Sequence, residues 1–187
     1  KMKTVEQIGL ENYNACMRVF NCSGNDVYYG NNQLYKNNWI LPEGPHEWLA
    51  LELTESKYPI RTGCHFEHRT GMVNFSIVGR NADPEQRKDY YTYDCENKER
   101  ERIATDFNAM YPKLQAEVGG ETGIDIFEKG RNKAQVLQYF NEPDTIKFYG
   151  DRTDPAGNDY PIACLLEPEQ VFAVTSWQQT RELLLNE

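Results

Sequence analysis

The sequence lacks any apolar run of the roughly 18 residues that a helix needs to span a bilayer, and no signal-peptide pattern opens it. Positive charge is also scarce: 20 basic residues stand against 29 acidic ones, so the formal net charge is −9. Non-specific nucleic-acid binding depends on a basic surface, so we expect neither a membrane nor a nucleic acid as partner. The few cysteines are scattered and odd in number, which favours reduced thiols and a cytoplasmic location over a disulfide framework. They are Cys16, Cys22, Cys64, Cys95 and Cys164.

What the sequence does have is a succession of short strands and helices over 187 residues, enough for one large or two small domains. Alternation of apolar and polar residues predicts strands, and turn or capping residues mark the helix ends. The expected strands are residues 15–20, 27–29, 33–35, 65–69, 72–78, 114–118, 122–127, 146–149 and 171–174. The expected helices are residues 4–10 and 48–58 and those that begin at Asp83-Pro84, Asp94, Asn132 and Ser176. Strands that alternate with helices near the C-terminus imply a parallel sheet there.

Three of these segments carry more specific predictions. In 72–78, one face is mixed and the other apolar, as in a sheet that packs on one side and binds on the other; Met72, Asn74 and Ser76 lie on the first, and Val73, Phe75 and Ile77 on the second. In the helix after Asn132, Ala134, Leu137 and Phe140 should face inward. The charge run 98–102 is interpreted as the solvated face of the helix that Asp94 caps.

An acidic loop follows the strand at 146–149. Asp151, Asp154, Asn158 and Asp159 stand within nine residues of one another, just past the carboxyl end of the strand. Ligands of open α/β sheets bind at that edge, and clustered hard oxygen donors suit Mg²⁺. Asp, Gly and Asn are also ordinary turn residues, so an acidic surface loop is the alternative.

The run GDRTDPAGND at 150–159 resembles the last acidic motif of the haloacid dehalogenase superfamily, and most closely that of the eukaryotic-type phosphomannomutases. Two further matches occur in the order and spacing of that family: FEHRTGMVN at 66–74 with Gly79-Arg80 and Glu85-Gln86-Arg87, and Gly119-Gly120 with IDIF at 124–127. The resemblance implies an α/β fold with an incomplete Rossmann-like core, residues 1–37 and 127–187. An α+β cap that binds sugar phosphate, residues 38–126, is inserted in that core.

The resemblance also implies roles for individual residues. Arginines hold phosphate oxygens bidentately, and the implied substrate-binding residues are Arg69, Asn74, Arg80, Arg87 and Asp125. Lys133 matches the lysine that neutralises the transferring phosphoryl group. Asp151, Asn158 and Asp159 match the Mg²⁺ motif: Asp151 matches the metal ligand, and Asn158 and Asp159 match the half that supports the outer shell of the metal or orients the lysine. From the residues alone, surface ion pairs for the arginines, an edge or turn carboxylate for Asp125 and a solvated helix position for Lys133 stay open.

One family motif is missing from the sequence: nothing reads D-x-D-x-T, the run that supplies the nucleophilic and the acid/base aspartates. The first βαβ unit of the core is then expected in a longer form of the protein or in a separate chain. The implied activity is Mg²⁺-dependent interconversion of hexose 6-phosphate and hexose 1-phosphate, mannose first, through an aspartyl-phosphate. A sugar-phosphate phosphatase, or a non-catalytic binding or assembly protein, is the alternative, and a homodimer through the cap is a further expectation.

Overall fold

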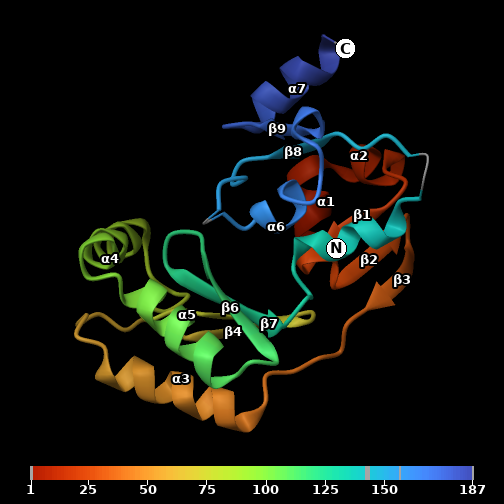
Figure 1. The fold of residues 1–187 in the computed structure, drawn as a ribbon. Helices are drawn as coiled ribbons and strands as arrows, with labels where there is room; N and C mark the ends of the chain where they lie inside the picture. Colours follow the sequence, from red (N-terminus) through yellow and green to blue (C-terminus); the bar gives the residue numbers. More distant parts are fainter. Residues whose placement is uncertain (1, 142–143, 156, 187) are drawn as a thin grey trace. The chain divides into compact units, whose positions relative to one another are not determined.

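The structure of the chain, a computed structural model, describes residues 2–141, 144–155 and 157–186. It is a mixed α/β protein, as expected, and its elements fall into two compact units, Lys1–Arg131 and Asn132–Glu187 (Figure 1). The core and cap boundaries predicted from the sequence stay a prediction. Over the described ranges, no helix combines the length and the apolar character needed to cross a membrane.

The first unit opens with two short helices and a small sheet. Helices α1 (Met2–Ile8) and α2 (Leu10–Ala15) precede an antiparallel sheet of order β1-β2-β3. Its strands are β1 (Val19–Asn21), β2 (Asp26–Tyr29) and β3 (Asn32–Lys36), with the 3₁₀ turn η1 (Cys22–Gly24) between the first two. The hairpin predicted at 27–35 is confirmed, and Gly30 at its turn has a φ of 53°. The strand predicted at 15–20 is present only at Val19 and Phe20: α2 extends to Ala15 and buries Tyr13 completely, and residues 16–18 connect the two elements.

A four-stranded antiparallel sheet with helices on one face forms the rest of this unit. The strand order is β4-β5-β7-β6. The strands are β4 (Phe66–Arg69), β5 (Met72–Phe75), β6 (Leu114–Gly119) and β7 (Gly123–Glu128), and the helices are α3 (Glu43–Glu55), α4 (Pro84–Asn97) and α5 (Glu99–Met110). Figure 1 shows α3 and α5 along the same side of this sheet. The predicted α+β lobe with a single sheet is present.

The apolar core of this sheet lies between its helix-covered face and the helices. Val73 and Phe75 are buried in it, which confirms the apolar face predicted for 72–78 over the length of β5; the strand ends at Phe75, and Ile77 is buried beyond its end. Ile124 and Ile126 of β7 join them, and the helices contribute Leu49, Tyr90, Ile103 and Phe107. Because strand side chains alternate between faces, the neighbouring residues of β5 and β7 point to the opposite face.

The helix boundaries in this unit follow local capping chemistry. Asp83 caps α4 in a full capping box with Gln86, as its Asp-Pro sequence predicts. The expectation that Asp94 caps the next helix is wrong, because α4 continues to Asn97. Lys98 then adopts the left-handed conformation, with a φ of 53°, which ends α4 before α5 begins. The Asp94 carboxylate instead accepts hydrogen bonds from the backbone N–H and the Nε of Arg100, both at 2.8 Å.

The second unit contains a two-stranded parallel sheet of β8 (Phe148–Gly150) and β9 (Val171–Ala173), which confirms the parallel pairing. Its helical segments are η2 (Lys133–Tyr139), α6 (Tyr160–Ala163), η3 (Pro168–Gln170) and α7 (Trp177–Leu185). Asn132 caps η2 as predicted, but η2 is a 3₁₀ helix and Phe140 beyond its end is 43% exposed, so the inward face was wrong there. Ser176 caps α7, while the Gln179 side chain accepts from the N–H of Thr175 rather than of Ser176.

Candidate functional site

A row of polar side chains crosses the face of the four-stranded sheet opposite the helices. Glu67 on β4 pairs across the sheet with Asn74 on β5, Asn74 with Asp125 on β7, and Asp125 with Glu117 on β6. Directly opposed residues of neighbouring strands share a face. The Nδ2 of Asn74 donates to Oδ1 of Asp125 at 2.7 Å. The mixed face predicted for 72–78 is therefore the polar face of the sheet.

Two of the three predicted arginines meet on this face around one carboxylate oxygen. Arg69 lies two residues after Glu67 on the same strand and so on the same face. Its Nη2 donates to Oε2 of Glu67 at 2.6 Å, and Nη2 of Arg80 lies 2.8 Å from the same oxygen. Nη1 of Arg69 is 3.9 Å from Oδ1 of Asp125. We call these residues, Glu67, Arg69, Asn74, Arg80 and Asp125, the arginine cluster.

Arg80 reaches the cluster from a loop because the chain before it is tightly placed. Gly79 has a φ of 88°, and a Cβ at this position would lie 1.9 Å from the carbonyl oxygen of Thr62. The N–H of Arg80 then donates to the carbonyl of Cys64 at 2.7 Å. Only glycine combines this left-handed conformation with so close an approach. Gly79 thus fixes the backbone conformation that places the guanidinium of Arg80 in the cluster.

Two glycines leave the space that the amide–carboxylate pair occupies. A Cβ on Gly123 would lie 2.4 Å from Nδ2 of Asn74, and one on Gly119 would lie 2.7 Å from Oδ2 of Asp125. The sequence motif includes Gly119 but not Gly123. The need for glycine at either position follows only from the register of β5, β6 and β7, which places Asn74 and Asp125 beside them. Any larger residue at either position would displace Asn74 or Asp125.

Glu67 and Arg69 of the cluster each favour the charged form of the other. The hydrogen bond with Arg69 is the main reason that the pKa of Glu67 lies below its usual value; burial opposes it, and the charges of Arg69, Arg80 and Lys3 add to it. Burial acts to lower the pKa of Arg69, but Glu67, by hydrogen bond and charge, and Asp125 raise it overall. The Oδ1 of Asn74 is buried without a hydrogen-bond partner among the described residues. This oxygen is closed to ligands in this conformation, so the accessible acceptor of the pair is the carboxylate of Asp125, whose side chain is 21% exposed.

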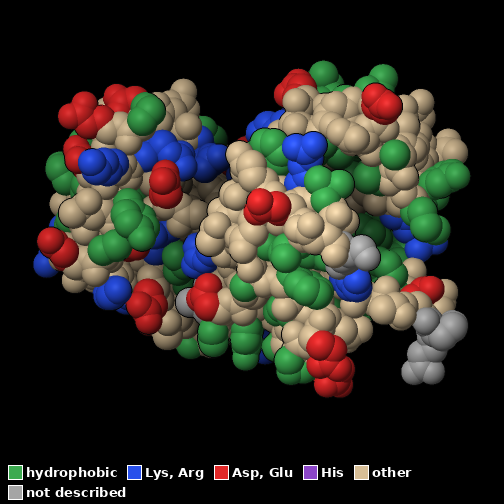
Figure 2. Space-filling view, turned by 90° about the horizontal axis from the view of Figure 1, so that it is seen from above, with side chains coloured by type: hydrophobic (Ala, Val, Ile, Leu, Met, Phe, Trp, Pro, Cys, Tyr) green, Lys and Arg blue, Asp and Glu red, His purple; other side chains and the backbone are tan. Residues whose placement is uncertain are grey.

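Arg87, the third predicted arginine, lies against a different acid. It is on the first turns of α4, and its Nε is 3.5 Å from Oε2 of Glu121, in the turn between β6 and β7. The structure thus brings Arg69 and Arg80 together with Asn74 and Asp125, and it gives Arg87 a separate partner. Basic and acidic side chains occur side by side over the face that Figure 2 shows.

A buried arginine, Arg100, holds the turn that carries Glu121, and nothing in the sequence indicates that this residue is buried. Nη1 of Arg100 donates to the carbonyls of Gly120 at 3.0 Å and Gly123 at 3.3 Å, and its Nε binds Asp94. The predicted solvated face at 98–102 is therefore wrong for Glu99 and Arg100, which are 7% and 4% exposed. Nothing in the charge run distinguishes the buried members from the exposed ones.

A second polar site lies in the second unit, at the acidic loop. The Nζ of Lys133 forms an ion pair with Oδ1 of Asp159, and the N–H of Arg152 donates to Oδ2 at 3.1 Å. In return, the N–H of Asp159 donates to the carbonyl of Arg152 at 3.0 Å, which closes the loop. Asp159 is only 4% exposed. Lys133 and Asp159, 26 residues apart in the sequence, thus form a partly buried pair as the motif suggested.

The pKa of Asp159 reflects these contacts. Burial alone would raise it, but the hydrogen bond and charge of Lys133 lower it overall, and the N–H of Arg152 and the side chain of Asp151 contribute further. Gly150 permits this arrangement, because a Cβ there would lie 2.9 Å from Oδ2 of Asp159. The aspartate is therefore held as a carboxylate facing an ammonium group.

The predicted metal ligands, Asp151, Asn158 and Asp159, all lie in the acidic loop. Asp151 and Asn158 are exposed, and the side chain of Asp151 lies near that of Asp159, so hard oxygens of the kind that Mg²⁺ prefers lie in the loop. Both oxygens of Asp159 already accept hydrogen bonds. Across the residues that the structure describes, no group of three or more His, Cys, Asp or Glu is placed to hold a metal. Ala156 of the motif lies outside the described residues, and the three-residue metal set stays a prediction.

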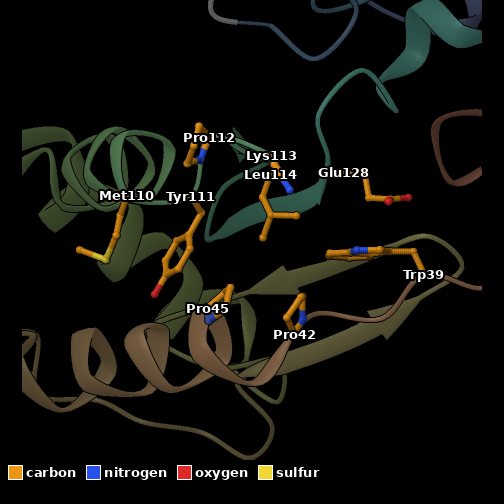
Figure 3. Close-up of a pocket in the computed structure, with 9 residues that line it drawn as sticks. All are labelled: Trp39, Pro42, Pro45, Met110, Tyr111, Pro112, Lys113, Leu114 and Glu128. Atoms are coloured by element: carbon orange, nitrogen blue, oxygen red, sulfur yellow. The ribbon is translucent and has the colours of Figure 1, made fainter.

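A separate cavity of about 440 Å³ lies at the start of α3 and the end of α5 (Figure 3). Aromatic rings and prolines dominate its lining, with one lysine and one glutamate; the lining residues are Trp39, Pro42, Pro45, Met110, Tyr111, Pro112, Lys113, Leu114 and Glu128. None of the predicted site residues is among them. The cavity is distinct from the arginine cluster.

Comparison with known proteins gives a consistent result. A family model described as eukaryotic phosphomannomutase matches residues 6–186. The chain is 35% identical to phosphomannomutase 1 of Dictyostelium discoideum over 130 residues, 67% of this chain and 52% of that protein. It is 32% identical to the phosphomannomutase of Saccharomyces cerevisiae over 170 residues, 86% of this chain and 67% of that protein. A phosphomannomutase of Arabidopsis thaliana is 36% identical over 106 residues, 56% of this chain and 43% of that protein. The chain spans about half the length of the curated relatives it matches.

Proposed function

We propose that this chain, which belongs to the eukaryotic phosphomannomutase family of the haloacid dehalogenase superfamily, binds the phosphate of a hexose phosphate with its arginine cluster. The reaction that it serves is the interconversion of hexose 6-phosphate and hexose 1-phosphate. Mannose is the proposed sugar, because the similar proteins of Dictyostelium discoideum and Saccharomyces cerevisiae are phosphomannomutases. The cytoplasmic location expected from the cysteines stays a prediction.

The observation that supports the phosphate site most strongly is the pair of guanidinium groups around Glu67. Each guanidinium has five N–H donors in a fixed fork, and the contacts with Glu67 and Asp125 use only some of them. Guanidinium forks match phosphate oxygens in geometry and charge. The carboxylate of Asp125, which the amide of Asn74 holds in place, supplies an acceptor for a sugar hydroxyl beside that phosphate.

The lysine–aspartate site has a different proposed task. The ammonium of Lys133 would neutralise charge on a phosphoryl group, and Asp159 orients it by the contact described above. Asp151 and the amide of Asn158 are the residues that we propose to hold Mg²⁺, with Asp159 beside them. A bound Mg²⁺ would supply electrostatic stabilisation of phosphate oxygens. Titration with Mg²⁺ alone, followed by the chemical shifts of Asp151 and Asn158, tests this; unchanged shifts at millimolar Mg²⁺ contradict it.

The phosphate site is tested by binding. Hexose 6-phosphate is titrated into the wild-type chain and the Arg80→Gln variant by calorimetry, with Arg181→Gln, an exposed arginine on α7, as the matched control. We expect Arg80→Gln to weaken binding by about tenfold or more, since a charge-assisted hydrogen bond contributes about 1.5–3 kcal/mol, and Arg181→Gln to leave it unchanged. Equal binding by all three proteins would exclude the arginine cluster as the phosphate site.

A binding role without turnover is the second candidate, because guanidinium groups such as those of Arg69 and Arg80 bind phosphate through charge and hydrogen bonds alone. The products of a single assay separate the candidates. Incubation with mannose 1-phosphate and Mg²⁺ yields mannose 6-phosphate if the protein is a mutase and inorganic phosphate if it is a phosphatase. Hexose phosphate binding with neither product is the outcome expected of a binding protein.

A further inference from the structure

We propose that Glu67 is a specificity-determining residue: an internal counter-anion that limits how tightly the arginine cluster binds a phosphate dianion. This inference rests on the proposed function, because it concerns the same ligand at the same guanidinium groups. Glu67 is part of the FEHRTGMVN motif, but the resemblance assigned no role to it. The structure assigns it one through its position between the two arginines.

The geometry makes Glu67 the centre of the cluster. A single oxygen, Oε2, contacts Nη2 of Arg69 at 2.6 Å and Nη2 of Arg80 at 2.8 Å. The other oxygen lies 3.9 Å from Nζ of Lys3, a side chain that is 88% exposed. The Glu67 side chain is itself 27% exposed, so solvent and ligands reach the place where the three charged groups meet.

The position of Glu67 has two opposite consequences for an incoming anion. Two guanidinium groups side by side repel each other, and a carboxylate between them offsets this repulsion in the absence of ligand. The same carboxylate repels the phosphate and uses one N–H group of each arginine. The two arginines, Glu67 and Asp125 together have no net charge, so attraction of the phosphate depends on local geometry rather than on an excess of positive charge.

The strength of this repulsion depends on the charge of the ligand. In water-like surroundings, a unit charge about 6 Å from a dianion changes its affinity by roughly tenfold, and that of a monoanion by roughly threefold. Replacement of Glu67 by glutamine keeps the size and an acceptor oxygen while removing the charge. A role in packing alone would instead weaken all ligands alike, or none.

The test uses two small probes that differ in charge. Methyl phosphate, a dianion at pH 8, and dimethyl phosphate, a monoanion, are titrated into the wild-type chain, Glu67→Gln and Glu101→Gln. Glu101 is exposed on α5, which packs on the opposite face of the sheet, so its variant is the matched change in net charge. We expect Glu67→Gln to bind methyl phosphate roughly tenfold more tightly and dimethyl phosphate roughly threefold more tightly, whereas Glu101→Gln matches the wild type.

The possible outcomes separate this inference from the proposed function. If the wild type binds methyl phosphate and Glu67→Gln binds it equally or more weakly, the charge of Glu67 does not limit binding and the inference is wrong. The phosphate site is not affected by this result. If methyl phosphate binds neither protein, the phosphate site falls and the inference with it. Should Glu67→Gln fail to fold by circular dichroism, Glu67→Ala removes the same charge and must show the same increase in affinity.

Discussion

Arg100 gives the sharpest prediction about stability, because it is a buried charge with a buried partner. Its guanidinium donates to the carboxylate of Asp94 at 2.8 Å and to carbonyls of the β6–β7 turn, and the two residues are 4% and 7% exposed. The change Arg100→Met keeps much of the apolar stem. It leaves the Asp94 carboxylate without its counter-ion, and the turn carbonyls lose their donor.

Loss of one partner of a buried ion pair costs about 3–5 kcal/mol, a large part of the 5–15 kcal/mol typical of a domain. We expect urea unfolding to show a decrease of this size in the free energy of unfolding of Arg100→Met. The double variant Asp94→Asn, Arg100→Met should be less destabilised, since no unpaired charge is buried. A decrease below about 1 kcal/mol for Arg100→Met would refute the assignment of Arg100 as the anchor of the turn.

Three further predictions concern the two polar sites. Gly79→Ala places a methyl group 1.9 Å from the Thr62 carbonyl at a φ of 88°, so we expect weaker hexose phosphate binding and a loss of at least about 1–2 kcal/mol in unfolding free energy; calorimetry that shows wild-type affinity would contradict it. Gly123→Ala should displace Asn74, 2.4 Å from the added Cβ, and weaken binding, whereas Gly44→Ala, in open space on α3, should not. Because the pKa of Asp159 is lowered in the fold, its contribution to stability is fully present above the unfolded value of about 3.9 and is lost as pH falls through the folded value; Asp159→Asn should abolish that part of the acid transition, and an identical pH profile of unfolding would speak against the Lys133 contact.

Local chemistry made part of this fold predictable. Asp-Pro at 83–84 specifies a helix start by itself, and the period-two pattern of 72–78 specifies a strand with two unlike faces. Errors arose where tertiary burial decides. The chain gives no local signal that Arg100 is buried while Arg102, two residues on, is half exposed, because that difference depends on the distant glycines of the β6–β7 turn.

The candidate site shows the same division. Arg69, Arg80, Asn74 and Asp125 could be named from a resemblance; the strand registers bring Arg69, Asn74 and Asp125 together, and Arg80 joins them from a loop. Glu67 was visible in the motif, yet its role depends on Arg80 reaching the same oxygen from a loop. Lys133 was predicted as the phosphate neighbour, and Asp159 as a metal ligand or as the residue that orients the lysine; the structure places the two side chains in contact.

The most direct test of the central claim is a crystal structure of this chain with mannose 6-phosphate bound. The account predicts phosphate oxygens within hydrogen-bond distance of the guanidinium groups of Arg69 and Arg80, and a sugar hydroxyl that donates to the carboxylate of Asp125. A phosphate bound elsewhere, for instance beside Trp39 in the apolar cavity, with Arg69 and Arg80 still engaged only by Glu67, would contradict it.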